Sequence, residues 1–450
     1  MSVLPGGLRV CVESVPQYGR GLAAVALTVA AGGDDDPAGR HGTAHLVEHL
    51  MFPRSGREGS ADPAGEGYAA LVAGAGGVCN AETHRDHTVF HTTVPAELLP
   101  DALAWEAGRL LGFAPTEDVI RTETDVIGEE IRGAGDAGRY WESALGALYP
   151  GSRDSFGTAA ELAGITAGEV EAFFRAHYTA PRMVLSVVGD VDPARVMAVV
   201  REVFGGVGVI GVAGVARAAV VARVAGEVRT AEEPRAAEQT RAAREIRAAE
   251  APRAATEIRT APLPAARPGV AVGHPLPDPV AERPAYLAQA VLAQVLGRSR
   301  LPALARSARD GHRLTSATVT CGYHGQWLAS AAPDLTLAVL GRAPGTEVGA
   351  AVDIWRSVLR AVADGPLPEA EHRRAVNSLL VAWHRQADSL PTRAVALGRD
   401  ALLLPGSAGP DALPAELRRT TPAEVSAAAR ALLEGPVTVT ELAPQKGTVG

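Results

Sequence analysis

Cysteine is scarce in this sequence. The three cysteines, Cys11, Cys79 and Cys321, stand far apart in 450 residues, and none belongs to a Cys-x-x-Cys pair. This spacing argues against a disulfide scaffold and against a zinc site built from thiolates, and it is typical of proteins in a reducing cytosol. Aromatic residues make up only 4% of the chain, so we expect hydrophobic cores built from Ala, Val and Leu.

An excess of basic charge and long hydrophobic runs are also missing. The formal net charge of −8 argues against nucleic acid as the main partner. Residues 1–7 contain neither a basic leader nor a long apolar stretch, and no apolar window elsewhere has the length and composition of a membrane span. We therefore expect a cytoplasmic protein with no signal peptide and no membrane segment.

The length of the chain predicts more than one domain. A chain of 450 residues is too long for a single core, and an apolar content of 47% excludes a mainly disordered protein. Composition divides it into domains at 1–205 and 269–450, joined by an Ala/Arg/Glu/Pro-rich segment at 206–268. Arginines recur every six residues over 229–259 without an apolar stripe, which predicts a flexible charged linker, with an arginine-dependent docking arm as the alternative.

A histidine motif lies in a predicted helix at about residues 41–53. In the run His45-Leu46-Val47-Glu48-His49, the two histidines are four positions apart and therefore share one helix face. Two imidazoles at this spacing can bind one cation, and Zn²⁺ is the commonest choice. Glu48 lies on the same side, and the order His-x-x-Glu-His is the inverted zincin motif, in which the glutamate is a general base.

A later predicted helix, starting after Thr116, supplies the third ligand. Glu123 and Glu130 are seven positions apart and share a face. We assign Glu130 as the ligand and Glu123 as the acceptor that orients a ligand histidine; Glu129, about 100° away, is the competing ligand. A set of two histidines and one glutamate leaves a fourth position for water, which is the catalytic form of a zinc site.

Three segments together resemble the pitrilysin/insulinase family of zinc peptidases. Residues 42–52 are similar to its active-site helix, 123–130 to its second glutamate segment, and 178–192 to a passage near the end of its first domain. The resemblance covers residues 4–205 and resumes more weakly from about 269. It implies an α+β fold of two related domains, each a mainly antiparallel sheet packed with helices, as in the mitochondrial-processing-peptidase branch.

The resemblance also implies an activity and substrate contacts. It implies zinc-dependent hydrolysis of peptide bonds, in which Glu48 takes a proton from zinc-bound water. Asn80 and Ala81 are similar to the family's substrate-facing strand, along which a peptide would add as an extra strand. Arg306 matches the arginine of the arginine–tyrosine pair with which the family holds the substrate carbonyl.

Part of the family's pattern is missing from the second half. The tyrosine position, seven residues after Arg306, holds Arg313, or Leu314 if one residue is inserted, and no inverted zinc motif follows. We therefore expect a second family subunit to supply the pair, in a heterodimer that processes precursor (leader) peptides; a homodimer is an alternative. The competing hypothesis is a non-catalytic assembly or peptide-binding subunit of the same fold.

Overall fold

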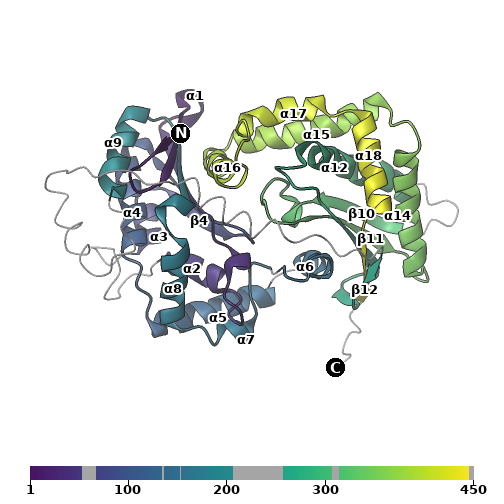
Figure 1. The fold of residues 1–450 in the computed structure, drawn as a ribbon, viewed down its shortest axis with the longest axis horizontal. Helices are drawn as coiled ribbons and strands as arrows, with labels where there is room; N and C mark the ends of the chain where they lie inside the picture. The colour runs from purple at the N-terminus through teal and green to yellow at the C-terminus, as the bar shows by residue number, and fades with distance from the viewer. Residues whose placement is uncertain (53–66, 134–135, 153, 206–256, 307–313, 445–450) are drawn as a thin grey trace. The chain divides into compact units, whose positions relative to one another are not determined.

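The chain folds into two compact units (Figure 1). This computed structural model describes residues 1–52, 67–133, 136–152, 154–205, 257–306 and 314–444. Unit 1 comprises Met1–Gly133, Arg153–Ala248 and Gln386–Pro410, and unit 2 comprises Ala134–Ser152, Ala249–Arg385 and Asp411–Gly450. Most of the predicted linker and of its arginine repeat, residues 206–256, lies outside the described residues.

Unit 1 is a six-stranded sheet in the order β1-β2-β6-β3-β5-β4, antiparallel except where β2 runs parallel to β6. Its strands are β1 (Ser2–Val3), β2 (Arg9–Ser14), β3 (Leu22–Val29), β4 (Val78–Thr83), β5 (Thr88–Pro95) and β6 (Met183–Gly189). Its helices are α1 (Pro16–Gly19), α2 (Thr43–Leu50), α3 (Tyr68–Gly74), α4 (Leu99–Leu111), α5 (Glu117–Gly133), α7 (Ala159–Leu162), α8 (Ala167–His177), α9 (Pro193–Phe204) and α16 (Leu390–Leu403).

Strand β3 shows why this sheet is covered on both faces. Its side chains alternate, so that Val25 and Leu27 enter the core beneath α2, α4, α8 and α9, whereas Ala24 and Ala26 pack against α16. A strand buried on both sides needs a nearly continuous apolar sequence, and β3 has one. The small alanines on the second face leave room for α16, which approaches closely at Gly398.

Unit 2 is built around a second sheet in the order β10-β11-β9-β12-β7, with β8 also paired to β12. Its strands are β7 (Ile258–Arg259), β8 (Leu263–Ala265), β9 (Gly269–Pro275), β10 (Leu314–Cys321), β11 (Leu335–Arg342) and β12 (Thr438–Pro444). Its helices are α6 (Asp136–Leu148), α12 (Arg283–Val295), a π-helical segment (Leu296–Arg300), α13 (Leu301–Arg306), α14 (Val348–Ala363), α15 (Glu369–Ala387), α17 (Leu413–Arg419) and α18 (Pro422–Glu434).

The two units share one topology. In each, a central strand pairs with an antiparallel strand on either side, giving β6-β3-β5-β4 in unit 1 and β12-β9-β11-β10 in unit 2. The strand beyond β6 is parallel, and so are the short strands beyond β12. A helix follows the central strand in both, α2 after β3 and α12 after β9. The predicted α+β fold of two related domains is therefore confirmed.

Each unit includes a helix from the other half of the sequence. Helix α16 belongs to unit 1, where the Arg9 guanidinium donates to the carbonyl of Ala401 and Arg393 pairs with Glu13. Helix α6 belongs to unit 2, where it packs on β9 and β12. The domain boundaries predicted at 205 and 269 assign α6 to the first domain and α16 to the second, which differs from the observed units. Sequence composition carries no signal for this exchange.

The segment predicted as a linker ends earlier than residue 268. Residues 258–265 contain β7 and β8, which pair in parallel with β12 and so belong to the sheet of unit 2.

Within the part of the chain that the structure describes, every helix is too short or too polar to cross a lipid bilayer.

Candidate metal centre

Helix α2 carries the histidine motif, and its first turn is held from outside the helix. The helix begins after Gly42, whose φ of 101° lies in the left-handed region that favours glycine. The carboxylate of Asp36 accepts hydrogen bonds from the backbone N–H groups of Gly42 and Ala44, at 2.7 and 2.8 Å. An acidic acceptor at a helix N-terminus satisfies free N–H groups and complements the helix dipole.

His41 ties this turn to a second loop. Its Nδ1 lies 3.0 Å from Asp36 and its Nε2 lies 2.8 Å from Asp154. Burial alone would lower the pKa of His41, but the hydrogen bonds to Asp154 and Asp36 raise that pKa to about 9. Asp154 also accepts from the backbone N–H of Phe156, whose ring contacts His45 edge-on. The start of α2 is thus fixed from two directions.

Three donor atoms converge between α2 and α5. The Nε2 atoms of His45 and His49 lie 3.6 and 3.5 Å from Oε2 of Glu130. One ligand atom from each residue lies within 4.8 Å of the others. A tetrahedral Zn²⁺ with bonds of about 2.0–2.1 Å would separate its donors by about 3.3–3.4 Å, so this set fits the ion. Burial lowers the pKa of His45 to about 4, which keeps the imidazole in its neutral, ligating form.

The structure places the three glutamates of α5 in different surroundings. Glu123 is buried, and its Oε2 lies 3.3 Å from Nδ1 of His49, on the other side of the ring from Glu130. Burial alone would lower the pKa of His49, whereas the hydrogen bond to Glu123 raises it. Glu129, the competing ligand, is exposed and pairs with Arg132. The geometry brings together Glu130 and the two histidines, with Glu123 behind His49.

Glu48 lies in the last turn of α2, a helix that contacts both α5 and β4. The residue as a whole is half-buried. Burial raises the pKa of Glu48 to about 7, so this carboxyl group can take up and return a proton near neutral pH.

A buried arginine, Arg109, contacts the C-terminal end of α2, and it was not predicted from the sequence. The guanidinium of Arg109 forms three hydrogen bonds to Glu106, at 2.5, 2.6 and 3.1 Å, and reaches the carbonyl of Met51 at 3.4 Å. It lies 4.4–5.2 Å from the ring centroids of three aromatic side chains, Phe52, Tyr68 and Phe90. The pairing of Glu106 with Arg109 three positions later was the available signal, but that spacing usually marks an exposed helix face.

The predicted substrate contacts lie in different units. Asn80 is exposed on β4, whereas Ala81 points into the core of unit 1. Among the described residues β4 pairs only with β5, so its other edge carries free backbone groups. Arg306 is the last residue of α13 in unit 2, and the tyrosine position at Arg313 lies outside the described residues.

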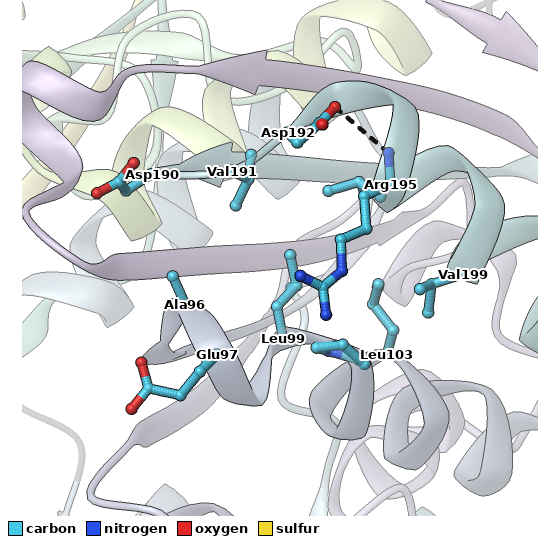
Figure 2. A pocket seen from close by; sticks show the side chains of 11 residues that line it. Ala96, Glu97, Leu99, Leu103, Asp190, Val191, Asp192, Arg195 and Val199 are labelled. Atoms are coloured by element: carbon cyan, nitrogen blue, oxygen red, sulfur yellow. Dashed lines mark hydrogen bonds between the residues drawn. The ribbon is translucent and has the colours of Figure 1, made fainter.

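Among the described residues of unit 2, a hollow lies at the place that corresponds to the metal cluster of unit 1. This cavity of about 320 Å³ lies between α12, the π-helical segment and β10, and none of the described residues that line it is His, Asp or Glu. Another hollow, of about 120 Å³, lies in unit 1 between α4 and the start of α9 (Figure 2). Figure 2 shows Arg195 extending over its apolar floor, which includes Leu99 and Val199, and no residue of the α2 motif lines it.

Comparison with known proteins finds models of one peptidase family over two segments of the chain. The family model described as Insulinase (Peptidase family M16) matches residues 12–134, and the model described as Peptidase M16 inactive domain matches residues 164–379. Between them the two models match well over half of the chain.

Several curated relatives are similar over their matched regions. An uncharacterized zinc protease of Mycobacterium tuberculosis is 32% identical over 209 residues, or 45% of this chain and 46% of the relative. The mitochondrial-processing peptidase subunit beta of Saccharomyces cerevisiae is 28% identical over 212 residues, or 45% of this chain and 44% of the relative. The matches therefore span under half the length of these relatives.

Solved structures match along nearly the whole chain. A protease from Helicobacter pylori has a TM-score of 0.76 at 18% identity and covers 98% of both chains. A putative M16-like peptidase from Alicyclobacillus acidocaldarius has a TM-score of 0.71 at 18% identity, covering 99% of this chain and 97% of its own. At this identity the likeness shows the fold. The two family models, the relatives and the two-unit topology together show that the chain belongs to the M16 (pitrilysin/insulinase) family of peptidases.

Proposed function

We propose that the chain is a zinc-dependent endopeptidase that hydrolyses peptides or unfolded segments. One observation carries the proposal: the donor atoms of His45, His49 and Glu130 lie within 4.8 Å of one another, with Glu48 in the same helix turn as His49. The relatives named as zinc proteases support the choice of metal. Packing of α2 against α5 does not require two imidazoles and a carboxylate to converge at one point, so a metal accounts for the arrangement better than stability does.

Each residue has a distinct part in the proposed reaction. His45, His49 and Glu130 would hold the ion, and Glu123 would keep the His49 ring oriented through its Nδ1. Zinc bound there would polarise the substrate carbonyl and acidify the attacking water. Glu48 accepts the proton of that water and later returns it to the amine that leaves. The free edge of β4 at Asn80 would take the peptide as an added strand.

We further propose that this chain is the catalytic subunit of a heterodimer that processes precursor peptides. Two observations support this: the expected tyrosine after Arg306 is absent, and relatives of the matched region are named as subunits of mitochondrial-processing peptidase. A partner chain carrying the arginine–tyrosine pair should then raise the cleavage rate of the mixture well above that of this chain alone. Equal rates with and without that chain would contradict the heterodimer.

The alternative function is a non-catalytic assembly or peptide-binding subunit. Two observations favour such a role for the second half of the chain: the described residues that line the unit 2 hollow include no His, Asp or Glu, and residues 164–379 match an inactive-domain model. They leave the cluster on α2 unexplained.

The substitution Glu48→Gln distinguishes the two functions. It removes the proposed base but no metal ligand, so zinc content should stay near one ion per chain. Cleavage of an unstructured peptide should fall by about a hundredfold or more, since positioned general bases contribute about 10²–10⁴-fold. Full activity in the zinc-loaded variant would contradict the assigned base, and a wild-type chain that binds zinc but cleaves nothing with any partner would favour the binding subunit.

A further inference from the structure

The carboxylate of Glu48 is held by a side chain from another element. The hydroxyl of Thr83, the last residue of β4, donates a hydrogen bond to Oε2 of Glu48. Within the part of the chain that the structure describes, Glu48 accepts no other hydrogen bond. Its second oxygen, Oε1, is left as an acceptor.

The position of Thr83 is set by the hairpin that contains it. Thr83 pairs with Thr88 at the closed end of the β4–β5 ladder, and the backbone N–H of His84 donates to the carbonyl of His87 at 2.8 Å across the turn. The Thr88 hydroxyl in turn donates to the carbonyl of Ala31, which anchors the hairpin to the neighbouring β3 segment. A β-branched side chain on such a fixed backbone has few rotamers, so its hydroxyl points in a defined direction.

A glutamate side chain does not have this rigidity. It turns about three bonds, and helix α2 fixes only its Cα and the direction of Cβ. A general base is effective only when its oxygen lies within hydrogen-bond reach of the proton that it takes. A contact that fixes one oxygen and leaves the other free provides that alignment.

From this geometry we propose that Thr83 is the positioning residue of the general base. Its hydroxyl holds Oε2 of Glu48, so that Oε1 faces the attacking water and receives its proton. The inference rests on the proposed peptidase function. It also connects base and substrate, because Thr83 belongs to the strand whose residue Asn80 is expected to contact the peptide. Peptide added along β4 would hold in place the same strand that orients the base.

Two substitutions at this position separate the hydroxyl from the shape of the side chain. Thr83→Val keeps the β-branch and the volume but cannot donate, whereas Thr83→Ser keeps the donor. Thr93→Val, on the neighbouring β5, makes the same chemical change at a half-buried strand position and serves as the control. We expect Thr83→Val to lower kcat by about 10–100-fold with KM and zinc content unchanged, since misplacement by about 1 Å can cost about 10²-fold. Thr83→Ser should recover most of the rate, and Thr93→Val should match the wild type.

A crystal structure of the zinc-free protein supplies a second readout that does not depend on activity. Glu48 should occupy one rotamer in the wild type and in Thr83→Ser, and several rotamers in Thr83→Val. A single unchanged rotamer in Thr83→Val, or a wild-type kcat in that variant, would overturn the inference. So would a Thr83→Ser variant that is as slow as Thr83→Val, because then only the shape of the side chain matters. If no peptide is cleaved but the rotamers spread as expected, the peptidase function fails while the positioning contact stands.

Discussion

The contact between Glu123 and His49 allows a quantitative test of the metal centre. Glu123 is 4% exposed, and its Oε2 lies 3.3 Å from Nδ1 of His49, whose Nε2 faces Glu130 at 3.5 Å. The substitution Glu123→Gln keeps the side-chain volume and an acceptor oxygen but removes the negative charge. The His49 ring would keep its place, while Nε2 would become a weaker donor to the metal.

The expected loss follows from what such partners contribute elsewhere. Removing a residue that orients a metal-ligating histidine typically costs about 10–100-fold in metal affinity. At 25 °C this range corresponds to about 1.4–2.8 kcal/mol of binding free energy. Because the Glu123 carboxylate is buried rather than screened by water, we expect a value inside this range and not below it.

The assay is a competition for zinc against a chromophoric chelator at fixed pH and ionic strength. Glu129→Gln is the matched control, since it makes the same change on the same helix, next to Glu130, at an exposed residue that pairs with Arg132. Wild type and Glu129→Gln should bind zinc equally. Wild-type affinity in Glu123→Gln would refute the role given to Glu123, and a large loss in Glu129→Gln would reassign the third ligand.

Two further predictions concern stability. Replacing Arg109 by Met should lower the free energy of unfolding by about 3–5 kcal/mol, because the buried carboxylate of Glu106 loses its charged partner and keeps only the hydrogen bond from Tyr68 among the described residues. Chemical denaturation measures this loss, and the double variant with Glu106→Gln should recover part of it. The His41 pKa, raised from 6.5 to about 9, means that the folded state favours the protonated ring. This stabilisation is complete below about pH 6.5 and is lost as the pH rises through 9. The denaturation midpoint of the zinc-free protein should therefore decrease as the pH is raised from 6.5 to 9, and His41→Gln should make this decrease smaller. An equal decrease in the wild type and in His41→Gln would contradict the stabilising role given to the protonated His41 ring.

The sequence was informative wherever the site depends on one helix. His45 and His49 share a face because four residues make slightly more than one helical turn, whatever the rest of the chain does. The same local rule predicted that Glu123 and Glu130 share one face of their helix. In the structure both of these glutamates face His49.

The contacts between distant elements could not be predicted in this way. Glu129 and Glu130 are neighbours with the same chemistry, and only the rotation of α5 against α2 decides which one meets the histidines. Similarly, nothing in the periodicity of β4 indicates that the Thr83 hydroxyl reaches Glu48. These choices depend on packing over long sequence separations.

By itself, then, the sequence determined the types of the candidate ligands and their helical spacing, because these follow from short-range backbone geometry. Length and composition predicted more than one domain, whereas the α+β class of two related domains was implied by the resemblance to a known family. Tertiary structure alone decided three further features: the selection of Glu130, the burial of Arg109 under α2, and the exchange of α6 and α16 between the units. The physical reason is that each of these depends on how preformed elements pack, and the free energy of packing is shared among residues far apart in the chain.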